Sequence, residues 1–262
     1  MRPLSEMPPA TRRGITGILT DIDDTLSTEG RLTAAAYSAL ERLHEAGLKV
    51  IPVTGRPAGW CDHIARFWPV DAVVGENGAF WMRYDRGARK LSTVHAGTPP
   101  ADRQARLDAI AREILAAVPG CALASDQFCR VADLAIDFCE DVTPLPPAAV
   151  DEIVRRMEAQ GMRAKVSSIH VNGWFGDYDK LSTTLRMLRE AFACDLESAH
   201  ERARWVFVGD SPNDAPMFGF FEHSVGVANV RDCADRLDTP PAYVTHRRAG
   251  EGFVELAVML LA

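Results

Sequence analysis

The stretch Gly17-Ile18-Leu19-Thr20-Asp21-Ile22-Asp23-Asp24-Thr25 decides how the chain is organised. The residues before Asp21 form a short apolar run, typical of a buried strand, and three carboxylates crowd the end of that strand. Ligands of an open parallel sheet bind beyond the carboxyl ends of its strands. Like charges so close together are costly unless a cation or raised pKa values offset them. The stretch therefore predicts a site for a hard cation such as Mg²⁺, the alternative being a turn that caps the next helix.

This stretch opens an alternation of strands and helices. Thr33 can cap the first helix, and Gly47 is a natural stop for it. The sequence then predicts a strand over 48–53, a helix that ends at about 68 and a strand over 72–74. The alternation returns after Gly173, as a helix over about 179–193, strands over 204–208 and 224–227, and a last helix over about 252–261. This pattern predicts an α/β, Rossmann-like core with a parallel sheet and right-handed crossovers.

The middle of the chain has a different pattern. A hairpin is predicted over 80–83 and 90–93, with Gly87 in its turn. Helices follow over about 100–118 and 148–160, and strands over 131–139, 163–166 and 169–172. Two helices among antiparallel strands indicate an inserted α+β domain. We therefore expect a core over 14–81 and 173–262, an insert over 82–172 and a flexible extension over 1–13.

Three more polar clusters follow predicted elements. Gly209-Asp210-Ser211-Pro212-Asn213-Asp214 comes directly after a strand and adds two acids, with a plain turn and helix cap as the alternative. Thr54-Gly55-Arg56 offers a hydroxyl and backbone amides that can hold phosphate oxygens at a helix N-terminus. Lys180 is a point charge suited to a phosphate, although most lysines are solvated surface. Each cluster is a weak signal alone, but two acidic strand ends in one parallel sheet are not easily dismissed together.

These residues resemble, in order and spacing, the four motifs of the haloacid dehalogenase (HAD) superfamily: Asp21-x-Asp23-x-Thr25, Thr54, Lys180 and Gly209-Asp210-x-x-x-Asp214. Gly75-Glu76-Asn77-Gly78-Ala79 is similar to the hallmark of subfamily IIB. In that branch an α+β cap of the C2B type lies between the second and third motifs. The resemblance covers nearly the whole chain after Arg13. The branch includes sucrose-phosphate, trehalose-phosphate and mannosyl-3-phosphoglycerate phosphatases and the Cof-type phosphatases.

The resemblance implies a Mg²⁺-dependent phosphomonoester hydrolase that acts through an aspartyl-phosphate. It implies that Asp21 is the nucleophile and that Asp23 protonates the leaving group and then activates water. The implied phosphate-binding residues are Thr54, Gly55, Lys180 and Asn213. The implied ligands of Mg²⁺ are the Asp21 carboxylate, the Asp23 backbone carbonyl, Asp210 and Asp214. The candidates for substrate contacts are Asn77, Lys165, His170 and Asn172. For the three in the last hairpin, the alternative is that they lie on a solvated strand face.

Composition narrows the classes of partner. The net charge of −7 argues against sequence-independent binding of nucleic acid or anionic membrane, because both need a basic face. No apolar run reaches the roughly 18–20 residues that span a bilayer. Six scattered cysteines without a CxxC pair favour a reduced, cytoplasmic setting. We expect a small phosphorylated substrate, a sugar first, and a monomer or homodimer. The alternatives are a phosphotransferase or mutase of the same superfamily, a non-enzymatic phosphoacceptor switch and a phosphosugar sensor.

Overall fold

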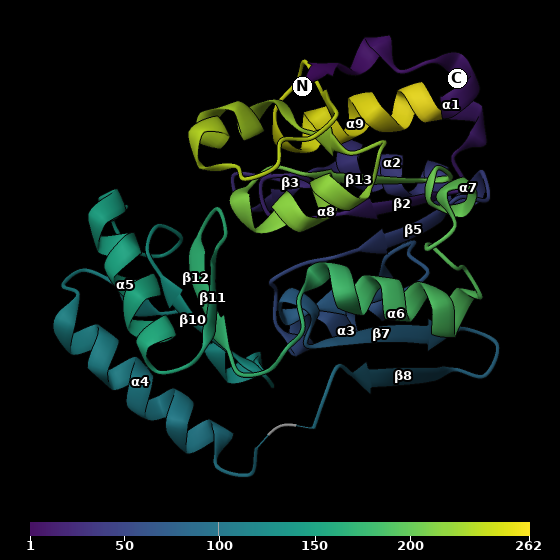
Figure 1. Ribbon diagram of the computed structural model, residues 1–262. Coiled ribbons are helices and arrows are strands. Elements are labelled where there is room, and N and C mark those ends of the chain that lie inside the picture. Colours follow the sequence, from purple (N-terminus) through teal and green to yellow (C-terminus); the bar gives the residue numbers. More distant parts are fainter. Residues whose placement is uncertain (99) are drawn as a thin grey trace.

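A six-stranded parallel sheet forms the centre of the protein (Figure 1). The computed structural model describes residues 1–98 and 100–262. The strand order is β1 (Arg2–Pro3), β15 (Tyr243–Val244), β14 (Val225–Gly226), β13 (Trp205–Gly209), β2 (Gly17–Thr20) and β5 (Lys49–Pro52). A parallel bridge from Val53 to Val74 continues this order to β6 (Val73–Gly75). The expected α/β core with a parallel sheet is confirmed.

Helices cover both faces of the sheet, because successive side chains of a strand point to opposite faces. Ile18 and Val50 belong to one apolar cluster, with α2 (Ala34–Glu45), α3 (Ala58–Phe67) and α9 (Ala249–Leu260). Leu19 and Phe207 belong to the other, with α6 (Lys180–Phe192) and α8 (Ala215–Phe220). Between β2 and α2, a small hairpin is formed by β3 (Ser27–Thr28) and β4 (Arg31–Leu32). The layered core brings the carboxyl ends of β2, β5 and β13 to one edge.

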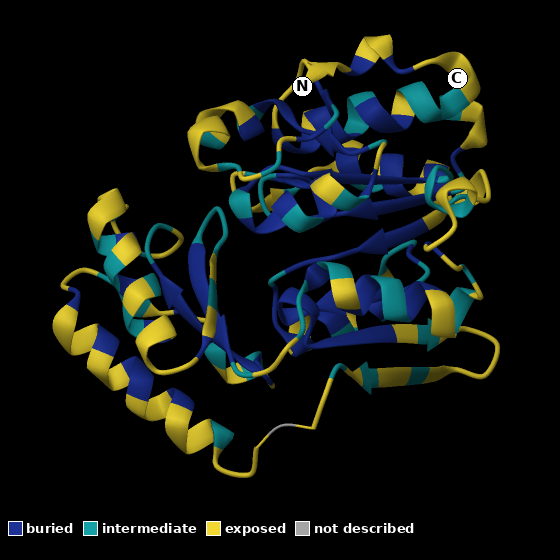
Figure 2. Cartoon of the chain, in the orientation of Figure 1, coloured by how far each residue is buried: buried dark blue, intermediate teal, exposed yellow. Residues whose placement is uncertain are grey.

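The insert is a four-stranded antiparallel sheet with two helices on one face (Figure 1). Its strand order is β11 (Arg163–Val166), β12 (His170–Trp174), β10 (Asp133–Asp137) and β9 (Ala122–Leu123). Leu134 and Val171 pack against α4 (Arg103–Ala117) and α5 (Pro147–Ala159), whose outer sides are exposed (Figure 2). The alternating residues of β12, such as His170 and Asn172, point the other way, toward the core. The polar face of the cap sheet therefore covers the edge where the core strands end.

The hairpin of β7 (Phe80–Asp85) and β8 (Lys90–His95) belongs to the core rather than to the cap. β7 pairs with β6, and Phe80 and Trp81 are buried in the two core clusters. The sequence analysis placed residues 82–95 in the insert because a hairpin pattern does not tell which neighbour it packs against. In the structure the insert begins only after His95.

Residues 1–13 are ordered, so the prediction of a flexible extension is wrong. They form β1, the 3-10 helix η1 (Leu4–Glu6) and most of α1 (Pro9–Gly14). Strand β1 pairs in parallel with β15, and Leu4 and Met7 are 1% and 0% exposed within the core. Two isolated apolar residues gave no periodic signal in the sequence, yet their burial holds the segment across the edge of the sheet.

Several short elements also lay outside the predicted pattern. They include β9, β15, the hairpin β3–β4, α7 (Ala199–Arg202) and the 3-10 helices η2 (Glu76–Gly78), η3 (Gln127–Cys129), η4 (Pro212–Asp214) and η5 (Ala228–Arg236). Helix α9 begins at Ala249, three residues before the predicted start at 252. Within the described residues, no helix combines the length and the apolar character needed to cross a membrane.

The burial of Leu4 leads to a stability prediction. Leu4→Ala should lower the free energy of unfolding by about 2–4 kcal/mol, because it leaves a cavity in a packed core. Chemical denaturation followed by circular dichroism measures the loss, with Leu115→Ala, at a side chain 38% exposed, as the control. If both variants lost less than about 0.5 kcal/mol, the segment would not be part of the cooperative core.

Candidate active site

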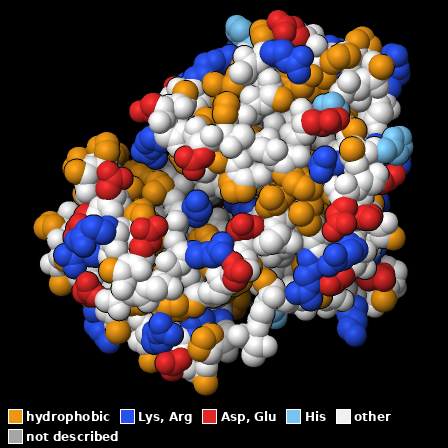
Figure 3. Space-filling model, in the orientation of Figure 1, with side chains coloured by type: hydrophobic (Ala, Val, Ile, Leu, Met, Phe, Trp, Pro, Cys, Tyr) orange, Lys and Arg blue, Asp and Glu red, His pale blue; other side chains and the backbone are white. Residues whose placement is uncertain are grey.

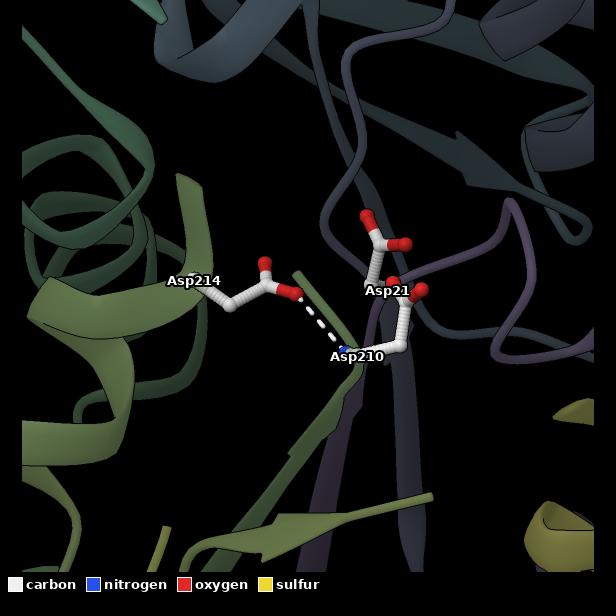
Figure 4. A group of neighbouring side chains, drawn as sticks. All are labelled: Asp21, Asp210 and Asp214. Atoms are coloured by element: carbon white, nitrogen blue, oxygen red, sulfur yellow. Dashed lines mark hydrogen bonds between the residues drawn. The ribbon is translucent and has the colours of Figure 1, made fainter. Parts of the chain in front are cut away.

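Three aspartates converge at the carboxyl edge of the central sheet (Figure 4). Asp21 directly follows β2, Asp210 follows β13, and Asp214 ends η4. The strands are parallel neighbours with Thr20 opposite Val208, so their ends meet at one edge. One carboxylate oxygen from each aspartate lies within 4.8 Å of the others.

Lys180 joins this triad from the first turn of α6. Its ammonium lies 2.7 Å from Oδ1 of Asp21 and 2.7 Å from Oδ1 of Asp214, and the residue is 3% exposed. The Asp179 side chain caps α6 and so fixes the start of the helix. Burial lowers the pKa of Lys180, but the two carboxylates raise it more, so the ammonium stays charged. Three carboxylates against one ammonium leave an excess of negative charge.

The donor set of the triad fits a divalent cation. Burial, with the neighbouring Asp214 and Asp23, raises the pKa of Asp21 to about 8, against the opposing effect of Lys180. Burial and the same crowding also raise the pKa of Asp210. Clustered, buried carboxylate oxygens are the ligands that hard cations prefer, and a bound cation offsets their repulsion.

Backbone and side-chain donors hold Asp210 and Asp214 in place. Oδ2 of Asp214 accepts hydrogen bonds from the amides of Asp210 (3.1 Å) and Ser211 (3.4 Å). A Cβ on Gly209 would lie 2.3 Å from that same oxygen, so this position requires glycine. Oδ2 of Asp210 accepts a hydrogen bond of 3.0 Å from the Asn229 side chain, a residue that the sequence analysis did not single out.

The turn after β5 supplies the predicted phosphate-binding group. The Thr54 hydroxyl is buried and accepts a hydrogen bond of 3.0 Å from the Arg56 amide. Gly55 lies beside Asn77, because a Cβ on it would be 3.1 Å from Asn77 Nδ2. The Asn213 side chain accepts a 2.8 Å hydrogen bond from the Ser211 hydroxyl and faces the same space as Gly55.

The cap lies closed over Asp21. A cavity of about 10 Å³ is lined by Asp21, Asp23, Gly55 and Asn213 of the core and by cap residues including Ser167, Ser168, His170 and Asn172. This space holds about one water molecule. Beyond Ser167 and Ser168 it borders a cleft of about 690 Å³ between cap and core, whose cap side is largely apolar, with Phe138, Leu145 and Val150. Figure 3 shows the hollow between the two parts of the molecule. A substrate can reach Asp21 only if the cap moves.

The four candidate substrate residues lie in two different places. His170 Nε2 lies 2.9 Å from Glu140, and Asn172 donates a hydrogen bond of 2.9 Å to Asp133, so both engage acids of the cap. Asn77 is buried with φ +53°, and Lys165 is exposed on β11, opposite Asn172. Asn77 and Lys165 line a separate cavity of about 300 Å³, together with Lys180.

Comparison with known proteins finds a family model that matches the N-terminal part of the chain. Residues 18–93 match the model of the haloacid dehalogenase-like hydrolases, and these residues include Asp21, Asp23 and Thr54. This part of the chain is similar to the haloacid dehalogenase-like hydrolases. No curated protein sequence matches it significantly.

Solved structures share the fold of this protein over nearly its whole length. A protein of Thermoplasma acidophilum has 19% identity and a TM-score of 0.68, over 94% of this chain and 98% of its own. A putative HAD/COF-like hydrolase of Plasmodium vivax has 17% identity and a TM-score of 0.69, over 95% and 96%. A HAD subclass IIB sugar phosphatase has 16% identity and a TM-score of 0.61, over 93% and 96%. At these identities the likeness is one of fold.

Asp23 is paired with an arginine that the sequence analysis quoted but gave no role. Both carboxylate oxygens of Asp23 accept hydrogen bonds of 2.8–3.0 Å from Arg56. Among the described residues, the clustered carboxylate oxygens come from Asp21, Asp210 and Asp214, so the ligand atom predicted for Asp23 stays its backbone carbonyl. Arg56 also reaches Asp126 and Glu140 of the cap. Neither acid lies near Arg56 in the sequence, so no local pattern could have revealed the pairs.

Glu76 of the predicted family hallmark ties the cap to the core. Its buried carboxylate accepts hydrogen bonds of 2.6–3.2 Å from four backbone amides, those of Ala58 in α3 and of Val131, Ala132 and Asp133 where the chain enters β10. Burial, with the nearby Asp133, raises the pKa of Glu76 to about 7, against the opposing effect of its hydrogen bonds. Arg130 adds a hydrogen bond of 2.9 Å to the Gly55 carbonyl. We call Glu76 and these four amides the Glu76 clamp.

Proposed function

We propose that this protein is a Mg²⁺-dependent phosphomonoester phosphatase that acts through an aspartyl-phosphate on Asp21. The observation that carries the proposal is the buried Asp21 carboxylate, which shares Lys180 with Asp214 under a closed cap. A HAD subclass IIB sugar phosphatase shares the fold over 93% of this chain. We therefore propose a phosphorylated sugar or a similar small metabolite as the substrate.

The proposed reaction has two steps. The Asp21 carboxylate attacks phosphorus, and the bond from phosphorus to the leaving oxygen breaks as Asp23 gives that oxygen a proton. Asp23 then takes a proton from water, which attacks the phosphorus of the aspartyl-phosphate and releases inorganic phosphate with Asp21 restored. Lys180, Thr54, the Gly55 amide and Asn213 would hold the phosphoryl oxygens while charge moves between them.

The carboxylates of Asp21, Asp210 and Asp214, with the Asp23 carbonyl, would hold Mg²⁺. When bound, the cation would lessen the repulsion between the Asp21 carboxylate and the phosphate dianion. Asn229 and the amide of Ser211 would keep Asp210 and Asp214 oriented around it.

Other features fit an enzyme acting on small metabolites. Acidic and basic side chains are interspersed on the face in Figure 3, which does not favour a nucleic-acid partner. All six cysteines are free thiols in the described structure, which fits a cytoplasmic setting. A phosphoacceptor switch has no need of a cap that excludes water from its aspartate. A monomer or homodimer stays a prediction.

Phosphate release tests this proposal directly. A panel of phosphorylated sugars, cofactors and nucleotides is incubated with the protein and Mg²⁺, and release is expected to fall by roughly 100-fold or more in EDTA. Excess Mg²⁺ should restore it, which controls for irreversible unfolding. Release that survives EDTA would contradict the metal site. No release, with phosphate retained on the protein, would favour the switch.

A further inference from the structure

Arg56 lies where the core and the cap meet, with acids of both around it. Its Nη2 lies 2.8 Å from Oδ1 of Asp23 in the core and 2.6 Å from Oε1 of Glu140 in the cap. Its Nη1 lies 3.4 Å from Oδ2 of Asp126, also in the cap. The guanidinium is buried and stacks on the ring of Trp60 at 4.3 Å. The cap therefore supplies two of the three carboxylates that fix this side chain.

Glu140 is itself held rigidly. One carboxylate oxygen contacts Arg56 and the other lies 2.9 Å from His170 Nε2. The amides of Cys139, Glu140 and Asp141 donate hydrogen bonds of 2.8–2.9 Å to the buried Asp137 carboxylate, which ends β10. Burial alone would raise the pKa of Glu140, but hydrogen bonds from His170 and Arg56 lower this pKa to about 2. Glu140 is thus a charged group at a fixed place in the closed cap.

Within residues 1–98 and 100–262, the side-chain hydrogen bonds of the Asp23 carboxylate all come from Arg56. Both of its oxygens bond to Arg56, so the orientation of Asp23 follows that of the guanidinium. A cavity of about 320 Å³ opens beside Asp23, and Ser27, Glu29, Cys139 and Ser168 line it.

We propose that Glu140 is a positioning residue for Asp23. With Asp126 it anchors Arg56, and through Arg56 it holds the Asp23 carboxylate toward the leaving oxygen. The inference rests on the proposed phosphatase function and adds a cap residue to its acid step. It also means that the proton donor is in place only when the cap is closed, because opening the cap removes Glu140 and Asp126 from Arg56.

The dependence of the rate on the leaving group tests this role. p-Nitrophenyl phosphate releases a weakly basic phenolate, which needs little protonation by an acid. Phenyl phosphate has nearly the same shape but releases a more basic phenolate, which needs the acid more. Glu140→Gln should therefore lower kcat for phenyl phosphate at least about 10-fold more than kcat for p-nitrophenyl phosphate, with KM little changed. Asp126→Asn should show the same bias, more weakly, and Glu140→Asp should recover part of the loss.

Asp141→Asn is the matched control, because Asp141 is the next residue of the same loop and is exposed. Thermal unfolding of each variant shows whether it is folded at the assay temperature, and Asp126→Asn carries the test if Glu140→Gln is not. An equal fall with both substrates, or none, would overturn the positioning role while leaving the phosphatase intact. A wild-type protein that hydrolysed neither compound nor any member of the panel would overturn the phosphatase itself, and this role with it.

Discussion

Asp21→Asn is expected to lower kcat for phosphate release by roughly 10⁴-fold or more, because an amide cannot attack phosphorus. The two side chains have nearly the same shape, and Lys180 keeps its 2.7 Å contact with Asp214. The variant should therefore fold and unfold at or above the wild-type temperature, since it relieves repulsion among buried carboxylates. Steady-state phosphate release and thermal unfolding measure the two effects.

Asp238→Asn serves as the control for this experiment, because Asp238 is an exposed aspartate far along the chain from the acidic triad. It should keep wild-type activity. If Asp21→Asn retained more than about a hundredth of the wild-type rate, attack would come from water or another residue, and the aspartyl-phosphate would have to be abandoned.

The second large effect concerns the Glu76 clamp. Glu76→Ala should lower the free energy of unfolding by about 3–5 kcal/mol, because it leaves four backbone amides without their acceptor in a buried place. For a chain of this size the melting temperature should fall on the order of 10 °C. Differential scanning calorimetry and denaturant titration measure the change.

Two variants make this result specific. Glu76→Gln keeps one acceptor oxygen and should lose about half as much, whereas Glu158→Ala, on the exposed side of α5, should lose little. A loss below about 1 kcal/mol in Glu76→Ala would show that water or a shift of β10 satisfies the amides. The clamp would then not be what joins the cap to the core.

The central sheet and the meeting of the acidic residues could be predicted, because both follow from local patterns. Each apolar run ends in its polar cluster, and parallel strands bring their ends to one edge whatever lies between them. The strand ends predicted that Asp21, Asp210 and Asp214 would meet, whereas Lys180 was expected there only because the motifs resemble those of a known family. The insert between Thr54 and Lys180 does not change which strands end at this edge of the sheet.

The contacts between core and cap could not be predicted, because they depend on how two folded parts dock. Glu140 follows β10 in the cap, and nothing near it in the sequence distinguishes it from a solvated acid. The same holds for residues 80–95 and for Leu4, whose partners lie far away along the chain. Arg56 was within a quoted motif, but its role depends on ion pairs with Asp23, Asp126 and Glu140 that only the folded structure forms.

The division of the sheet around the insert has a consequence for how the protein is made. Strand β2, which carries Asp21, leaves the ribosome before the cap, and β13, which precedes Asp210, leaves it afterwards. The cap is one continuous segment with its own apolar cluster, so it can fold while β2 has β5 beside it but still lacks its other neighbour, β13. The parallel pairing of β2 with β13 closes a loop that contains the entire cap, which is a slow kind of contact to form. The acidic triad is therefore assembled late in synthesis, after the cap that covers it has been made.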